Sequence, residues 1–103
     1  MLFRSLQGAD LSGCDLRKAR LRGADLRGAR LTGANLIRAD LRDARLGPLE
    51  IGEGRLLRTD LNRAVLRYAD LTGAQARRAR FLEADLSGAK LSGADLRGAE
   101  LVL

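Results

Sequence analysis

Apolar residues return at every fifth position along almost the whole chain, and the frame never shifts. In residues 21–41, LRGADLRGARLTGANLIRADL, the recurring residue is leucine, at positions 21, 26, 31, 36 and 41. A small residue, nearly always alanine, stands two positions before each leucine, and most of the other residues are polar, charged or glycine. A period of five matches neither an α-helix, at about 3.6 residues per turn, nor a β-strand, at about 2. The pattern therefore predicts a short internal repeat.

We call the recurring apolar position the centre of each unit. The centres are Leu6, Leu11, Leu16, Leu21, Leu26, Leu31, Leu36, Leu41, Leu46, Ile51, Leu56, Leu61, Leu66, Leu71, Ala76, Phe81, Leu86, Leu91, Leu96 and Leu101. The small position departs from alanine at Arg4, Cys14, Leu49, Gly54 and Thr59. Because Cys14 replaces an inward alanine, we expect a buried small side chain there and not a reactive thiol. Ala76 and Phe81 are neighbouring centres, so the large residue is expected to compensate for the small one.

The spacing within a unit predicts its local geometry. The small residue and the centre are two positions apart, so a short extended segment points both to one side and the residue between them outward. The last two residues turn a corner, and in units such as LSGA glycine takes the third turn position, where a type II turn requires positive φ. Units reading RKA, IRA, RDA or RRA are expected to use another turn type. Four such units, with four segments and four corners, close one square coil.

The unit A-(D/N)-L-x-x resembles the pentapeptide-repeat family, and the resemblance extends over essentially the whole chain. It implies an all-β fold, a right-handed quadrilateral β-helix (solenoid) of about five 20-residue coils stacked roughly 4.8 Å apart. Residues 1–103 are then one pentapeptide-repeat β-helix domain, with stacked leucines filling its axis.

Residues 47–55 break the pattern. Pro48 falls at a third turn position, where proline is disfavoured, and Leu49 is large for an inward alanine site. Either two degenerate units remain inside a continuous, distorted coil, or about ten residues leave as an irregular loop and the later columns rotate. LSGCDLR at 11–17 recurs as LSGADLR at 91–97, a whole number of coils later, which favours continuity. GADLRGA recurs at 23–29 and 93–99, half a coil out of step, which favours a loop. We favour the continuous coil.

In a continuous coil, residues four units apart stack into columns. Opposite charges then often meet on the faces, and one corner gathers positive charge around two aliphatic side chains. This candidate interaction ridge consists of Arg17, Lys18, Ile37, Arg38, Leu57, Arg58, Arg77, Arg78 and Arg97. An apolar centre surrounded by arginine has the composition of an interaction hot spot. The alternative is that arginine stems cover two incidental aliphatics, and a loop at 47–55 would break the ridge up.

The ends of a β-helix expose backbone edges and need covering. Leu2 and Phe3 are expected to fold over the first coil. Leu101, Val102 and Leu103 form an apolar C-terminal end, and the resemblance implies dimers formed through such ends. We therefore predict a homodimer.

Composition narrows the chemistry. The chain has 19 Lys and Arg against 13 Asp and Glu, a net charge of +6, one cysteine and no histidine. These features provide no internal disulfide, no cluster of metal ligands and no common general base. Nucleophile–base and phosphate-binding motifs are missing as well. We predict no enzymatic activity, cofactor or metal, and, without a leader or an apolar span, a cytoplasmic protein that does not engage membranes.

The remaining functions are binding functions. We predict a repeat scaffold for protein–protein interaction, whose partner presents an acidic surface. The alternative is phosphate-backbone binding of nucleic acid through the arginine ridge. The resemblance also implies a minority alternative, because some pentapeptide-repeat proteins bind topoisomerases or gyrase by imitating the charge of duplex DNA. A net charge of +6 departs from that imitation.

Overall fold

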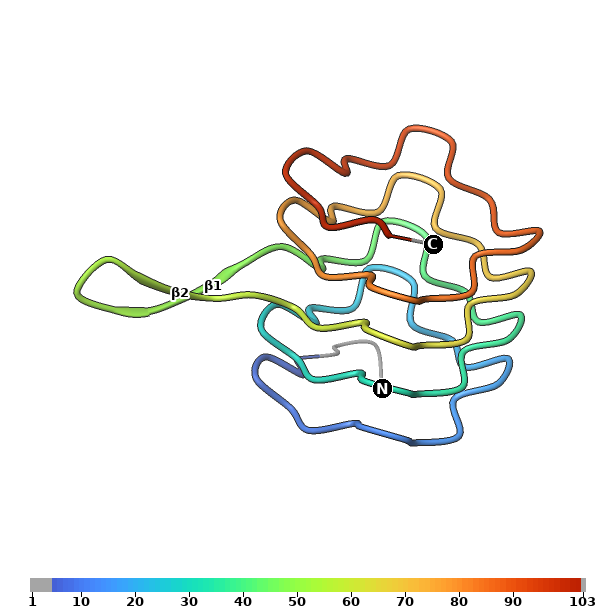
Figure 1. Ribbon diagram of the computed structural model, residues 1–103, viewed down its shortest axis with the longest axis horizontal. Coiled ribbons are helices and arrows are strands. Elements are labelled where there is room, and N and C mark those ends of the chain that lie inside the picture. The colour runs from blue at the N-terminus through green and yellow to red at the C-terminus, as the bar shows by residue number, and fades with distance from the viewer. Residues whose placement is uncertain (1–4, 103) are drawn as a thin grey trace.

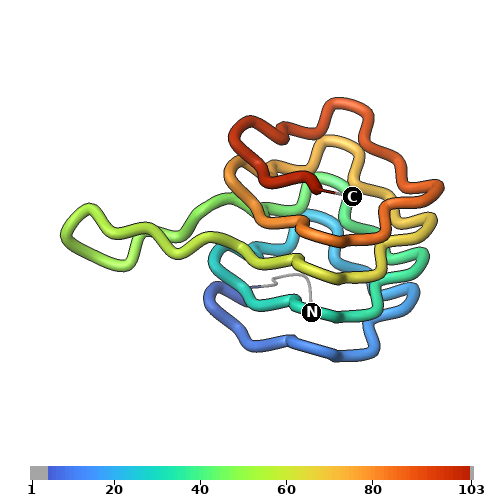
Figure 2. The backbone as a smooth tube through the Cα atoms, viewed as in Figure 1, coloured from blue at the N-terminus to red at the C-terminus, as the bar shows by residue number. Residues whose placement is uncertain are grey.

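The computed structural model describes residues 5–102 and shows a four-sided coil that rises from the N-terminus to the C-terminus (Figures 1 and 2). The outward residue of each unit forms an isolated parallel β-bridge with its counterpart in the next coil. Four faces result, with face 1 formed by Ser5, Asp25, Arg45, Gln75 and Asp95, face 2 by Asp10, Arg30, Asp60, Arg80 and Glu100, face 3 by Asp15, Asn35, Val65 and Asp85, and face 4 by Arg20, Asp40, Asp70 and Lys90.

Backbone hydrogen bonds tie each coil to the next in a fixed pattern. The N–H of a centre donates to the outward residue of the following coil, as from Leu36 to the Val65 carbonyl at 2.7 Å. The N–H of that outward residue donates back to the small residue before the centre, as from Val65 to the Ala34 carbonyl at 2.9 Å. Every coil thus serves as a template for its neighbour, which is why a five-residue pattern suffices to specify the fold.

The core lies along the axis. Apart from Ile51 and Leu56, the centres and alanines from Leu21 to Ala84 are buried there, and the largest fully buried side chain is Phe81, which is 1% exposed. Ala76, the preceding centre, is also fully buried. Centres near both ends of the coil, such as Leu6 and Leu86, are only partly buried, and Cys14, expected to be buried, is also only partly so.

The corners use one backbone conformation whatever residue occupies them. The N–H of the small residue donates to the centre three positions earlier, as from Ala39 to the Leu36 carbonyl at 3.0 Å. Lys18, Arg38 and Asp43 take φ of 60°, 59° and 57° at the third turn position, as the glycines do. The expectation of another turn type was therefore wrong. Left-handed backbone costs a non-glycine residue roughly 1–2 kcal/mol, and the hydrogen bonds on both sides of the corner impose it nonetheless.

Outward aspartate and asparagine stabilise the turns that follow them. One side-chain oxygen accepts the backbone N–H two residues later, as between Asp10 and Ser12 at 3.1 Å and between Asn35 and Ile37 at 3.1 Å. This local bond is the physical reason for the D/N position of the repeat. Outward charges also pair between coils, as the sequence predicted, because Arg45 lies 3.7 Å from Asp25 and Arg80 lies 3.1 Å from Glu100.

One corner gives way to a projecting hairpin. Strand β1 (Leu49–Gly52) pairs antiparallel with β2 (Arg55–Leu57), and Figure 1 shows the pair extending away from the coils. Its two-residue turn, Glu53 and Gly54, has φ of 49° and 73°, as a type I′ turn requires.

The hairpin changes the stacking of everything after it. Asp10 bridges Arg30, four units later, but Arg30 bridges Asp60, six units later, and the same shift occurs on all four faces. The favoured continuous coil was therefore wrong, and about two units of chain leave as a loop. Pro48 explains the break, because its fixed negative φ cannot provide the left-handed third position of a corner.

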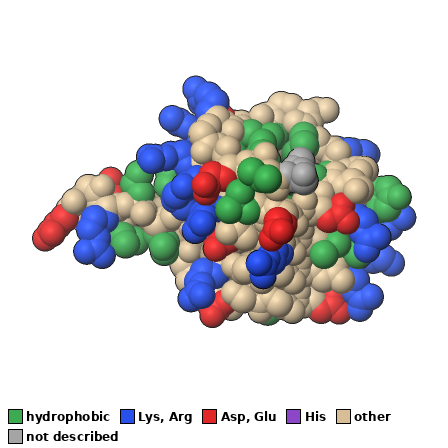
Figure 3. All heavy atoms as spheres, in the orientation of Figure 1, with side chains coloured by type: hydrophobic (Ala, Val, Ile, Leu, Met, Phe, Trp, Pro, Cys, Tyr) green, Lys and Arg blue, Asp and Glu red, His purple; other side chains and the backbone are tan. Residues whose placement is uncertain are grey.

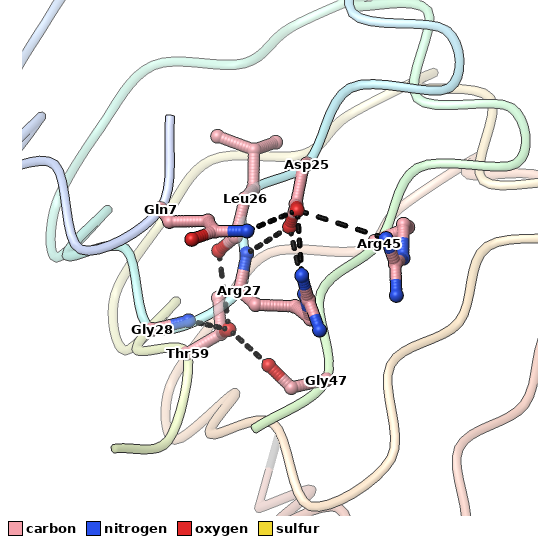
Figure 4. A network of polar contacts seen from close by, with 8 residues as sticks. All are labelled: Gln7, Asp25, Leu26, Arg27, Gly28, Arg45, Gly47 and Thr59. Carbon is pink, nitrogen blue, oxygen red and sulfur yellow. Dashed lines mark hydrogen bonds and ion pairs between the residues drawn. The ribbon is translucent and has the colours of Figure 1, made fainter. Parts of the chain in front are cut away.

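Charged side chains of both signs are interspersed over the body (Figure 3). Four aspartates form bidentate pairs with the arginine two residues later, namely Asp15, Asp25, Asp40 and Asp95 with Arg17, Arg27, Arg42 and Arg97. Hydrogen bonds from these arginine side chains lower the pKa values of Asp15, Asp40 and Asp95 to about 2. Arg27, with help from Gln7, holds the pKa of Asp25 lower still (Figure 4).

The lowered pKa values predict acid sensitivity. An aspartate with a depressed pKa in the folded state stabilises the fold above the unfolded value of about 4, and this contribution disappears as the pH falls towards 2. We expect the thermal midpoint to fall between pH 5 and pH 2, and Asp25→Asn to reduce the size of that fall. Asp60→Asn is the matched control, because asparagine stands two residues after Asp60. Equal pH profiles for the two variants would contradict the assignment.

Candidate functional site

The structure divides the predicted interaction ridge between two opposite corners. Leu57, Arg58, Arg77, Arg78 and Arg97 stay together at the corner from which the hairpin leaves. Here the Arg58 Nε donates to the Arg78 carbonyl at 2.6 Å and the Arg78 N–H to the Arg97 carbonyl at 2.9 Å. The prediction that all of these residues form a single ridge was therefore wrong, because the hairpin shifts the later units by half a coil.

The other four ridge residues, Arg17, Lys18, Ile37 and Arg38, lie at the corner between faces 3 and 4, where they are followed by Arg67 and Tyr68. The Arg38 guanidinium lies 4.9 Å from the centre of the Tyr68 ring. Gly88 follows in the same column and packs against the ring from the next coil. Tyr68 is 58% exposed, and the Arg38 guanidinium over its ring competes with any nucleic-acid base that would stack there.

The hairpin carries exposed apolar side chains. Ile51, Leu56 and Leu57 are 47%, 44% and 39% exposed. A two-stranded hairpin gains little stability on its own, so Ile51 and Leu56 have no evident structural role, whereas Leu57 also packs over Gly28. Clustered apolar groups on a projecting element are typical of a protein-binding surface.

The root of the hairpin is held by close packing over Gly28. A Cβ atom added to Gly28 would lie 2.9 Å from the Leu49 Cβ and 3.2 Å from the Leu57 Cδ2. Leu49 and Leu57 are also paired across the two strands. Glycine is therefore required beneath the hairpin for space as well as for its φ of 71°.

Thr59 completes the backbone hydrogen bonding at the root (Figure 4). At an ordinary corner the turn N–H donates to a carbonyl of the next coil, as Gly33 does to Asn62, but the hairpin removes that carbonyl for Gly28. The Gly28 N–H donates instead to Thr59 Oγ1 at 2.9 Å, and the fully buried hydroxyl lies 2.9 Å from the Gly47 carbonyl. This role explains why residue 59 is not alanine.

The packing at Gly28 gives a test of the hairpin seat. We expect Gly28→Ala to lower the free energy of unfolding by about 1–3 kcal/mol more than Gly13→Ala, because overpacking adds to the shared left-handed penalty. Gly13 is the matched control, with φ of 68° and no atom within 4 Å of an added Cβ. Chemical denaturation measures both variants, and equal losses would show that the leucines move aside without cost.

Arginines line the corner on the C-terminal side of the hairpin. We call Arg58, Arg77, Arg78 and Arg97 the arginine corner, and Figure 3 shows basic side chains gathered on the body beside the hairpin. Arg97 pairs with Asp95 at 2.7 Å and Arg58 with Glu100 at 3.3 Å. Within residues 5–102, Arg77 and Arg78 form no ion pair and are available to an incoming acidic group.

A cleft of about 400 Å³ lies between β2 and face 2. Its lining consists of Arg30, Leu56, Leu57, Arg58, Asp60 and Arg80. The apolar side chains of the lining thus come from the hairpin. Its three arginines and one aspartate come from the coil. Sequence reasoning missed Arg30, Arg80 and Leu56, because the cleft exists only once residues 47–57 leave the coil.

The remaining predictions concern absences and the C-terminal end. In the described part of the chain no three potential metal ligands come together, and no helix is long and apolar enough to cross a bilayer. Leu101 and Val102 are 42% and 66% exposed, while Leu2, Phe3 and Leu103 lie outside the described residues. The homodimer and the cytoplasmic location stay predictions.

Comparison with known proteins identifies the family. The chain belongs to the pentapeptide-repeat family, whose repeat profile matches residues 5–46, 53–81 and 79–102 with eight copies. No curated protein sequence gives a significant match. Proteins of this family form right-handed quadrilateral β-helices and act as non-enzymatic scaffolds, as the sequence predicted.

Solved structures agree with this family. A pentapeptide-repeat protein from the thylakoid lumen of Arabidopsis thaliana is 30% identical, with a TM-score of 0.78 over 93% of this chain and 60% of that one. HetL, a pentapeptide-repeat protein involved in heterocyst differentiation regulation in the cyanobacterium Nostoc sp. strain PCC 7120, is 37% identical, with a TM-score of 0.51 over 94% of this chain and 48% of that one. This chain therefore spans about half to three fifths of the length of these relatives.

Proposed function

We propose that this chain is a scaffold that binds another protein through the hairpin and the arginine corner, and that the partner presents an acidic surface with an apolar patch. The observation that carries the proposal is the position of Ile51, Leu56 and Leu57, exposed on a projecting hairpin beside the unpaired Arg77 and Arg78. Covering a Leu or Ile side chain fully is worth about 1.5–3 kcal/mol, so a partial cover of three can anchor a partner. Arginine beside an apolar anchor is the usual composition of an energetic hot spot.

Nucleic-acid binding is the second candidate, and the arginine corner is the observation that favours it. Four arginines in one column could neutralise several phosphates with little sequence preference. Against it, Arg58 and Arg97 are already paired with acids, and the Arg38 guanidinium lies over the ring of Tyr68.

Topoisomerase binding by charge imitation of DNA stays a minority alternative. Charged side chains of both signs are mixed over the surface, and the net charge is +6. No continuous acidic face among the described residues supports the imitation of duplex DNA.

Matched variants separate the candidates. Partner capture from source-cell extract is compared by quantitative mass spectrometry for four immobilised proteins. These are the wild type, Leu56→Asp, the double variant Arg77→Ser/Arg78→Ser and the opposite-corner control Arg17→Ser/Lys18→Ser. Binding of purified type II topoisomerase is tested separately. We expect one protein to be retained by the wild type and the control, and lost with the other two. In parallel, anisotropy measures binding to short duplex DNA at about 50 and about 200 mM salt.

Two results would overturn the proposal. One is capture that Leu56→Asp leaves unchanged. The other is DNA affinity that falls steeply with salt, disappears in Arg77→Ser/Arg78→Ser and survives in Leu56→Asp, which would establish the nucleic-acid alternative.

A further inference from the structure

We propose that the cleft beside β2 receives an extended, acidic peptide segment of the partner, which adds to the hairpin as a third strand. This inference rests on the proposed protein-binding function and names the form in which the partner enters.

The first step of the argument is a free strand edge. Among the residues that the structure describes, the sheet contains β1 and β2 only, so β2 (Arg55–Leu57) pairs on one side and leaves its other backbone edge open. The cleft is lined by β2 and face 2 and by no residue of β1, so it lies beside that open edge. Open edges bind extended peptides through main-chain hydrogen bonds, and a third strand stabilises a hairpin that is marginal with two.

The second step is the chemistry of the lining. Three arginines and one aspartate line the cleft, with Asp60 between Arg30 and Arg80 in the column of face 2, and Leu56 and Leu57 form its apolar wall. Arg58 and Arg80 share the carboxylate of Glu100 at 3.3 and 3.1 Å, whereas Arg30 makes no ion pair within the described residues. The complementary ligand carries at least one carboxylate for Arg30 and one apolar side chain for the leucines.

The third step is preorganisation. The Glu53–Gly54 turn, the packing of Leu49 and Leu57 over Gly28, and the Thr59 hydroxyl all hold β2 at a fixed position relative to face 2. An edge that is already held loses little freedom on binding, which favours a peptide of modest length. A space of about 400 Å³ suits a short stretch of chain and not a folded domain.

The test uses a random peptide library displayed on phage, selected on the folded wild-type protein. We expect enriched peptides to contain Asp or Glu beside β-branched or other apolar residues and to lack proline. A synthetic copy of the best peptide is expected to bind about tenfold more weakly to Leu56→Asp and to Arg30→Ser. Ile37→Asp, at the opposite corner, and Arg20→Ser, on face 4, are the matched controls and should bind within about twofold of wild type. Thermal melting verifies that each variant is folded.

N-methylation then tests the strand itself. Backbone hydrogen bonds of an added strand alternate along the peptide, so methylating one alternate set of N–H groups should weaken binding about tenfold and the other set should not. Uniform effects of N-methylation would overturn strand addition while leaving a hairpin-based protein interface intact. Equal losses for Ile37→Asp and Leu56→Asp would show that the peptide does not bind in the cleft. A library without enrichment, or with basic winners, would overturn the acidic segment, and the capture experiment would still decide the broader function.

Discussion

Replacing Phe81 with alanine is expected to lower the free energy of unfolding by about 3–5 kcal/mol. Phe81 is the largest fully buried side chain, and it lies in a column of the axis where the other buried centres are leucine. The coils above and below are fixed by backbone hydrogen bonds, including that from the Phe81 N–H to the Glu100 carbonyl at 2.8 Å. The walls of the cavity therefore cannot collapse freely, and most of the lost packing appears as lost stability.

Two further variants make the Phe81 experiment decisive. Phe81→Leu is expected to lose only about 1 kcal/mol, because it restores the usual residue of a centre. Adding Ala76→Leu to Phe81→Ala should recover part of the loss if the two centres share space. Denaturant titration gives the free energies, and a loss below about 1 kcal/mol for Phe81→Ala would mean that the axis repacks around the missing ring.

Thr59→Val is expected to lower the free energy of unfolding by about 2–4 kcal/mol, although it preserves the shape of the side chain. The hydroxyl serves the Gly28 N–H and the Gly47 carbonyl, and valine leaves both without a partner where the hairpin leaves the coil. Buried backbone groups without partners are penalised by about 1–3 kcal/mol each.

Thr59→Ser is the control for this substitution, because it keeps the hydroxyl and removes only a methyl group. It should retain most of the stability that valine loses. Hydrogen exchange at the Gly28 amide reports the same bond directly, and faster exchange is expected in Thr59→Val alone. Unchanged exchange would show that another group satisfies this amide.

The coil and its core could be predicted from the sequence because the five-residue pattern is local and repeats without a slip. Inward leucine and alanine and outward aspartate follow from alternation along a short extended segment, and Phe81 was placed correctly by the same frame. The corner at Lys18 was less predictable. Residue preference disfavours a left-handed lysine, and only the hydrogen bonds of the neighbouring coil impose it.

The site could not be predicted in the same way. Because the units are interchangeable, the chain resembles itself at a whole number of coils and also half a coil out of step, so sequence echoes cannot decide which residues stack. Pro48 marked the break but not the path of the chain beyond it. The predicted ridge therefore placed Arg38 and Arg58 together, although they lie at opposite corners. Nothing in the sequence indicated the cleft around Arg30.

The change of stacking distance from four units to six at the hairpin has a consequence for how this molecule can diversify. The entropy lost on closing a loop grows only with the logarithm of its length. Lengthening the closed coil from four units to six therefore lowers the free energy of unfolding by only about 0.4 kcal/mol through loop closure. Once a threonine supplies the missing corner bonds and two leucines pack over Gly28, the length and sequence of the rest of the insert are nearly independent of the coils. The same β-helix can then carry different recognition segments at one corner, introduced by mutation in nature or by grafting in the laboratory, without changes to the packing of its core.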